Sequence, residues 1–125
     1  MKNDIMIGDW LYSIIYNQTL HKKPIRVTGI RTDTDNPPHI QGDDTDVWYS
    51  LDTYEPIPLT EEILQKNFPD PSEIVWFPLD TKPGYFNIYW EHPSFGDGEI
   101  RLNIQYVHEL QHILKLCNIN KEIEL

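Results

Sequence analysis

Two histidines and a glutamate near the end of the chain have the spacing of a zinc-hydrolase motif. His108, Glu109 and His112 read H-E-x-x-H. On a helix, histidines four residues apart project from the same side and can bind one Zn²⁺, while the glutamate acts as general base on a metal-bound water. These residues therefore offer one catalytic hypothesis, a zinc-dependent hydrolase.

The element that would position these residues is an amphipathic helix predicted over residues 104–117. At about 100° per residue, the two histidines fall on its polar side. Catalytic zinc also takes a third protein ligand, and the residues after His112 contain no histidine. We therefore expect His108 and His112 to face water, predict no metal and no cofactor, and keep zinc hydrolysis as the alternative. The apolar stripe comprises Tyr106, Val107, Leu110, Ile113, Leu114 and Cys117.

Other catalytic patterns are absent from the sequence. There is no G-x-S-x-G elbow and no glycine-rich phosphate loop. Cys117 lies on the apolar stripe of the predicted helix, so we expect a buried and inert thiol. The sequence thus assigns no catalytic residue and favours binding over catalysis.

The charge of the chain restricts its partners. The 125 residues carry a formal net charge of −10, from 20 acidic and 10 basic side chains. Such a surface repels phosphate backbones, so we expect no direct nucleic-acid binding. It favours a protein partner, and a basic one by charge steering. A second alternative is a nucleic-acid mimic or counter-defence protein, which the same charge suggests.

The sequence also bears on location. No apolar segment follows Lys2 and Asp4 as it would in a signal peptide. No run approaches the roughly 18 apolar residues of a membrane-spanning helix. We therefore expect a cytoplasmic protein without a membrane partner, and the sequence leaves its oligomeric state open.

The hydrophobic pattern predicts an α+β fold. We expect a single domain over residues 1–125, with a curved antiparallel, SH3-like sheet and two helices at about 60–68 and 104–117. Gly29 interrupts the alternation of one strand and predicts a bulge or tight curvature there. We read residues 55–59 as an extended connector because prolines disfavour helix there. Strands are predicted at 5–7, 10–16, 24–30, 47–51, 73–79, 85–91 and 99–104, with a possible edge strand at 121–125.

An acidic stretch at residues 31–46 reads as a loop because it is rich in Asp, with two Pro and one Gly. Its Asp side chains are oxygen donors of the kind that Ca²⁺ prefers, but the spacing of an EF-hand is absent, so we predict a solvated loop and leave cation binding open. Trp48 and Tyr49 follow it and point to opposite faces of a predicted strand. They are the candidate binding residues. The Asp residues are Asp33, Asp35, Asp43, Asp44 and Asp46.

Two blocks of sequence occur together in this chain. Residues 57–64 read IPLTEEIL, and residues 106–111 read YVHELQ, followed by KEIEL at 121–125. This pairing resembles a group of small uncharacterised proteins encoded by phages and prophages of gut Bacteroidetes, in which the position of the second histidine often holds another polar residue such as Asn. The likeness extends to the Gly-Asp-Trp opening and to IRVTGI at 25–30, and so covers most of the chain. It implies a phage or prophage context in the bacterial cytoplasm, and it brings no known activity. We therefore expect a non-enzymatic protein-interaction module.

Overall fold

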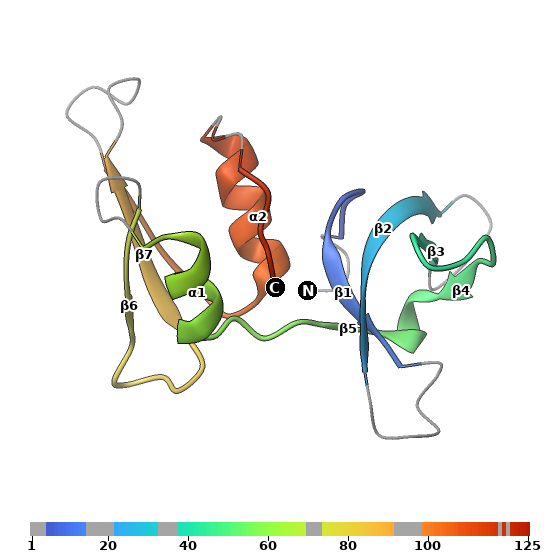
Figure 1. The fold of residues 1–125 in the computed structure, drawn as a ribbon, viewed down its shortest axis with the longest axis horizontal. Coiled ribbons are helices and arrows are strands. Elements are labelled where there is room, and N and C mark those ends of the chain that lie inside the picture. The colour runs from blue at the N-terminus through green and yellow to red at the C-terminus, as the bar shows by residue number, and fades with distance from the viewer. Residues whose placement is uncertain are drawn as a thin grey trace. The chain divides into compact units, whose positions relative to one another are not determined.

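The computed structural model describes residues 5–14, 22–32, 38–69, 74–91, 99–117, 119 and 121–125. Within these residues the chain forms eight strands in two antiparallel sheets and two α-helices (Figure 1). The predicted α+β class is therefore confirmed. The chain divides into two compact units, Met1–Ile57 (unit 1) and Pro58–Leu125 (unit 2). The single domain over residues 1–125 stays a prediction, as does the SH3-like detail of the sheet.

Unit 1 is built on an antiparallel sheet with the strand order β4-β3-β2-β1-β5. Alternation places Ile25 and Val27 of β2 in the core at 0% and 1% exposure. Their neighbours in the core are Leu11, Ile40, Leu51 and Tyr54. The strands are β1 (Trp10–Ser13), β2 (Lys23–Arg31), β3 (His39–Gly42), β4 (Tyr49–Ser50) and β5 (Tyr54–Pro56), with a 3₁₀ turn, η3, at Leu51–Thr53.

The predicted bulge at Gly29 is confirmed. Val27 pairs with Gly42, whereas Gly29 pairs with Gln41, so Thr28 is the extra residue on β2. A Cβ added to Gly29 would lie 2.6 Å from Cη2 of Trp48, so the indole occupies the space that any larger residue would need. The bulge bends β2, whose curvature is evident in Figure 1.

The loop prediction for residues 31–46 is wrong at His39–Gly42, which form β3. This strand is short, and the prolines before it and the aspartates after it are typical of loops. Pairing with β2 and burial of Ile40 at 1% exposure supply the stabilisation that the local sequence lacks. Asp33 and Asp35 lie outside the described residues.

The start of the chain also differs from expectation. Residues 5–7 form no strand. Instead, the Asp9 carboxylate accepts the Met6 N–H at 2.8 Å, and the Met6 carbonyl accepts the Asp9 N–H at 3.1 Å. Gly8 has a φ of 95°, which glycine adopts readily. Asp9 is therefore a buried turn-former, and β1 begins only at Trp10.

Two further predictions in unit 1 need correction. Residues 54–56, partly assigned to a connector, form β5 and pair with β1, where an edge position tolerates Pro56. The strand predicted at 47–51 is reduced to β4 because the chain turns into η3 at Leu51. Ser50 starts that turn by accepting the Asp52 N–H with its hydroxyl, at 3.4 Å.

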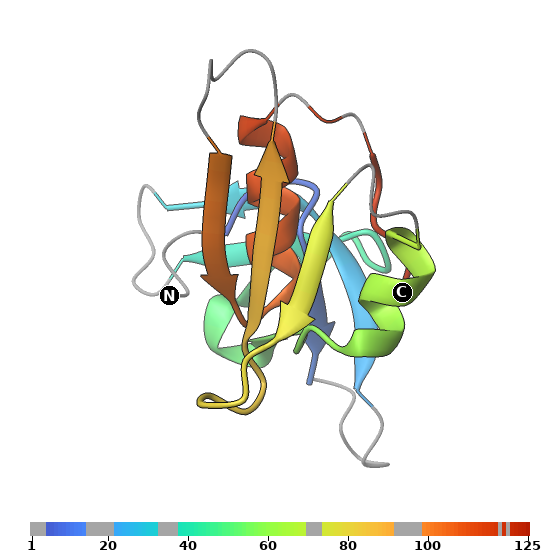
Figure 2. The same cartoon turned by 90° about the vertical axis from the view of Figure 1, so that its left-hand side faces the viewer.

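Unit 2 contains α1 (Glu61–Asn67), β6 (Val75–Pro78), β7 (Phe86–Glu91), β8 (Glu99–Ile104) and α2 (Val107–Leu116). The strands form an antiparallel sheet in the order β6-β7-β8, and α2 runs along one face of it (Figures 1 and 2). Phe86 and Ile88 of β7 and Ile104 of β8 are buried in the core of this unit. Alternation along residues 99–104 predicts that Leu102 points inward together with Ile104, but Leu102 is 41% exposed on edge strand β8.

Helix α1 begins as the sequence predicts. Thr60 is its N-cap, and the hydroxyl accepts the Ile63 N–H at 3.2 Å. Glu61 and Glu62 occupy the first turn, where the helix dipole favours them. The apolar side of α1 is buried at Leu64 and at the flanking residues Leu59 and Phe68, while Ile63 is half-buried.

The final residues do not form the strand considered from the sequence. Instead, the side chain of Asn67 forms hydrogen bonds with the backbone of these residues. Its Nδ2 donates to the Glu124 carbonyl at 2.7 Å, and its Oδ1 accepts the Glu124 N–H at 2.8 Å. One amide side chain thus pairs with both backbone groups of one residue.

Candidate functional site

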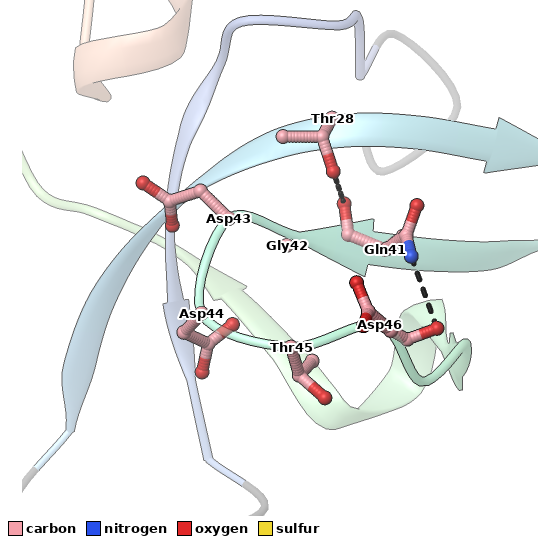
Figure 3. A pocket seen from close by; sticks show the side chains of 7 residues that line it. All are labelled: Thr28, Gln41, Gly42, Asp43, Asp44, Thr45 and Asp46. Carbon is pink, nitrogen blue, oxygen red and sulfur yellow. Dashed lines mark hydrogen bonds between the residues drawn. The ribbon is translucent and has the colours of Figure 1, made fainter.

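An open acidic pocket lies in unit 1, at the turn that follows β3 (Figure 3). It encloses about 420 Å³ and brings together three of the aspartates singled out in the sequence, Asp43, Asp44 and Asp46. Its remaining lining residues are Thr28, Gln41, Gly42 and Thr45, which carry hydroxyl and amide groups but no positive charge. We call this set of seven residues the acidic pocket.

The bulge in β2 positions one wall of the acidic pocket. Because Thr28 is the extra residue, its side chain lies beside β3, and its hydroxyl donates to the Gln41 carbonyl at 3.1 Å. The Gln41 amide in turn donates to the Asp46 carbonyl at 3.0 Å, as the dashed lines in Figure 3 show. The two hydrogen bonds join β2, β3 and the far end of the turn.

The turn itself is fixed to β2. The Asp43 N–H donates to the Arg26 carbonyl at 2.9 Å, and the Asp43 carboxylate accepts the Arg26 N–H at 3.1 Å. Further along, the Thr45 hydroxyl accepts the Val47 N–H at 3.1 Å. These bonds satisfy backbone N–H and carbonyl groups that would otherwise need a neighbouring strand as their partner. The carboxylates are therefore held by a defined turn, which lowers the ordering cost of binding.

Asp44 depends on the glycine before the turn. A Cβ on Gly42 would lie 2.8 Å from Oδ1 of Asp44 and 3.1 Å from Cδ1 of Ile25. The carboxylate therefore occupies space that glycine leaves open. The Asp44 side chain is only 7% exposed, and Lys23 Nζ lies 3.8 Å away and supplies a nearby positive charge. Asp44 is thus a fixed, largely buried negative charge at the base of the turn.

The sequence predicted a solvated acidic loop here, with cation binding left open. Among the residues that the structure describes, no three His, Cys, Asp or Glu side chains are grouped as a metal site requires. In Figure 3 the Asp43 carboxylate points away from those of Asp44 and Asp46, whereas Ca²⁺ coordination requires several oxygen atoms around one point. Separate carboxylates with hydroxyl and amide groups between them suit an ammonium or guanidinium group instead.

Trp48 and Tyr49, the candidate binding residues, do not line the acidic pocket. Trp48 is half-buried against Gly29, and the Arg31 guanidinium lies 5.5 Å from its ring centroid. Tyr49 packs against the core of unit 1. Both side chains therefore have structural contacts, and whether they bind a partner stays a prediction.

The histidine pair lies on α2, and the prediction that both rings face water is wrong for His108. His108 is 0% exposed, whereas His112 is half-buried. The His108 ring stacks on Tyr106 with centroids 5.9 Å apart and meets His112 edge-on at 5.6 Å. At 100° per residue, the buried positions of α2 span roughly 220° of the circumference of the helix. Burial therefore extends past the apolar stripe. The buried positions are Val107, His108, Leu110, Gln111, Ile113 and Leu114.

Glu109, the general base of the zinc hypothesis, has a structural role at the start of α2. Its Oε1 accepts the backbone N–H groups of Gln105 at 3.1 Å and Tyr106 at 3.0 Å. These belong to the segment that precedes the helix, where N–H groups lack helical partners. Helix capping therefore accounts for the glutamate of the H-E-x-x-H motif.

Cys117 follows the same helix and is buried at 5% exposure, as predicted. Burial raises the pKa of its thiol, because the thiolate is poorly solvated there. A raised pKa disfavours the nucleophilic form at neutral pH.

Comparison with protein-family models, with curated proteins and with solved structures finds no match to this chain. Sequence reasoning identified Asp43, Asp44 and Asp46 as a group, but missed Thr28 and Gln41, which only the strand pairing brings to them.

Among the described residues no helix is long and apolar enough to cross a membrane.

Proposed function

We propose that this chain is a non-enzymatic protein-interaction module that binds a basic partner through the acidic pocket. The observation that carries the proposal is the arrangement of Asp43, Asp44 and Asp46 on one hydrogen-bonded turn around an open pocket. The net charge of −10 supports it, because a negative field accelerates encounter with positive partners. The resemblance of residues 57–64 and 106–111 to phage and prophage proteins supports a role for this module in phage biology within a bacterial cytoplasm.

Recognition follows from the chemistry of the lining. A Lys or Arg side chain entering the acidic pocket meets carboxylates for its charge and the hydroxyl of Thr28 or Thr45 for hydrogen bonding. The fixed turn means that little side-chain entropy is lost on binding. Several such contacts are needed, since each partly exposed ion pair contributes only about 0.2–1 kcal/mol.

The experiment compares two triple variants with equal net charge. One carries Asp43→Asn, Asp44→Asn and Asp46→Asn, and the matched control carries Asp80→Asn, Glu122→Gln and Glu124→Gln, which lie exposed in unit 2. Fluorescence anisotropy measures binding of a short labelled Gly-Lys repeat peptide to each full chain. We expect the pocket variant to lose roughly tenfold in affinity, about 1.4 kcal/mol, and the control to lose much less. Equal losses would show that only the overall charge matters and would refute the site.

A further inference from the structure

One face of the sheet in unit 2 is left open by the two helices of that unit. Helix α2 runs along the other face, and in Figure 2, which is seen from the open side, neither α1 nor α2 lies in front of the strands. Ile88 on the covered side is 0% exposed, whereas Val75 and Phe77 on the open side are 39% and 48% exposed. Exposed apolar side chains that gather on one face often mark a binding surface.

Strand register defines this open face as two rows of residues across the sheet. Directly opposite residues of antiparallel strands share a face of the sheet, with Cβ atoms about 4.5–5.5 Å apart. The residues within each row are therefore neighbours. The first row is Phe77, Asn87 and Asn103, and the second row is Val75, Tyr89 and Arg101.

The two amides of the first row hold each other in a fixed orientation. Nδ2 of Asn87 donates to Oδ1 of Asn103 at 2.8 Å. Within the described part of the chain, this leaves Oδ1 of Asn87 as an acceptor and Nδ2 of Asn103 as a donor for a ligand. Because a hydroxyl group both donates and accepts, a ligand with neighbouring hydroxyls matches this amide pair.

The charge of the open face argues against an ionic ligand. Its two rows contain one charged residue, Arg101, and the next row along the sheet contains Glu91 opposite Glu99. These formal charges nearly cancel, so they give no strong field of either sign. The chain as a whole carries −10, which repels a phosphate backbone. The open face therefore favours a neutral ligand.

The size of the open face argues against a protein partner. The three strands run side by side for the four residues of β6, so the face covers roughly 200 Å². A specific protein–protein interface takes about 800 Å² from each partner. The open face is therefore sized for a small ligand.

We propose that the open face binds a neutral oligosaccharide. A sugar ring stacks on Phe77, and its hydroxyls hydrogen-bond to the amides of Asn87 and Asn103. The C–H groups on one side of a sugar ring are apolar and gain dispersion contact with a flat aromatic ring, while the hydroxyls at the edge of the sugar remain available. This ligand needs contact on one side only, whereas apolar small molecules need an enclosing pocket. The inference does not rest on the proposed function, because the residues and the ligand both differ.

The test is a ¹⁵N-¹H NMR titration of the full chain with three neutral probes: cellohexaose, maltohexaose and chitohexaose. We expect at least one probe to cause saturable shifts at the amides of the open face, with a dissociation constant on the order of millimolar. Because the probes are neutral, the affinity should be the same at low and high salt, unlike that of a basic peptide. No saturable shifts with any probe at about 10 mM would overturn the proposal. Shifts caused by a single-stranded oligothymidylate and by none of the sugars would overturn it in favour of a nucleic-acid platform.

Two variants separate the ring from the amides. Phe77→Ala removes the stacking surface, and Asn103→Asp keeps the acceptor for Asn87 but removes the donor left for the ligand. We expect each to bind the best probe at least roughly fivefold more weakly. Leu116→Ala is the matched control, because Leu116 is an apolar side chain, 80% exposed, at the end of α2, and it should bind as the wild type does. Far-UV circular dichroism checks folding, and Asn103→Asp decides the question if Phe77→Ala does not fold. Wild-type affinity in Asn103→Asp would contradict the proposal.

Discussion

The carboxylate of Glu109 accepts the backbone N–H of Tyr106 at 3.0 Å, across the first turn of α2. The same oxygen accepts the N–H of Gln105. The glutamate at the centre of the H-E-x-x-H letters therefore stabilises the start of the helix that carries it. Its negative charge also lies near the positive end of the helix dipole.

Removing this cap should destabilise the protein without affecting any metal. We expect Glu109→Ala to lower the free energy of unfolding by about 1 kcal/mol, and Glu109→Gln to lower it less, because the amide oxygen can still accept both hydrogen bonds. Urea denaturation followed by far-UV circular dichroism measures both. A Gln variant as unstable as the Ala variant would argue against the hydrogen-bonding role.

The zinc-hydrolase alternative makes a different prediction for the same helix. A catalytic site requires His108 and His112 to hold Zn²⁺ with a further ligand, so protein purified without chelator would contain close to one equivalent. Because His108 is buried and Glu109 is a cap, we expect far less zinc by elemental analysis, and the same content in His112→Asn. One equivalent lost in His112→Asn would revive the alternative.

Gly29 and Trp48 give a test of the bulge that shapes the acidic pocket. Because an added Cβ would lie 2.6 Å from the indole, we expect Gly29→Ala to cost about 1–3 kcal/mol by overpacking. In a Trp48→Leu background the same substitution should cost clearly less, since the clash is gone. Urea unfolding of the four chains measures the coupling, and strictly additive effects would contradict this contact.

Cys117 predicts a pH dependence of stability. Burial raises the pKa of the folded thiol above its ordinary value of 9.0, so the folded state keeps its proton at pH values where the unfolded state begins to lose it. Stability from this group is therefore complete below that value and declines as the pH rises through it. We expect the difference in the free energy of unfolding between wild type and Cys117→Ala to narrow as the pH rises past 9. Urea denaturation at a series of pH values measures this difference. A constant difference would mean that the thiol is not desolvated.

Local signals predicted some features of this fold well. Thr60 before two glutamates marked the start of α1, Gly29 marked the bulge, and alternation placed Ile25 and Val27 inside. Each depends on residues adjacent in sequence. The α+β class followed from these elements.

Other features depend on residues distant in sequence, which local patterns do not report. β3 forms because β2 lies beside it, and His108 is buried because α2 is enclosed on more than its apolar stripe. The pairing of Asn67 with Glu124 spans 57 residues and involves a polar residue in a helix, which has no sequence signal. The aspartates of the acidic pocket were visible as a group, but Thr28 and Gln41 were not, since strand register places them.

The most direct test of the proposed function maps where a basic peptide binds. The measurement is a ¹⁵N-¹H NMR titration of the full chain with the Gly-Lys repeat peptide at low salt. We predict saturable shifts confined to the backbone amides of the acidic pocket and of Arg26, which hydrogen-bonds Asp43, and we predict their loss at high salt. Shifts spread evenly over both units, or largest outside the acidic pocket, would contradict the proposal.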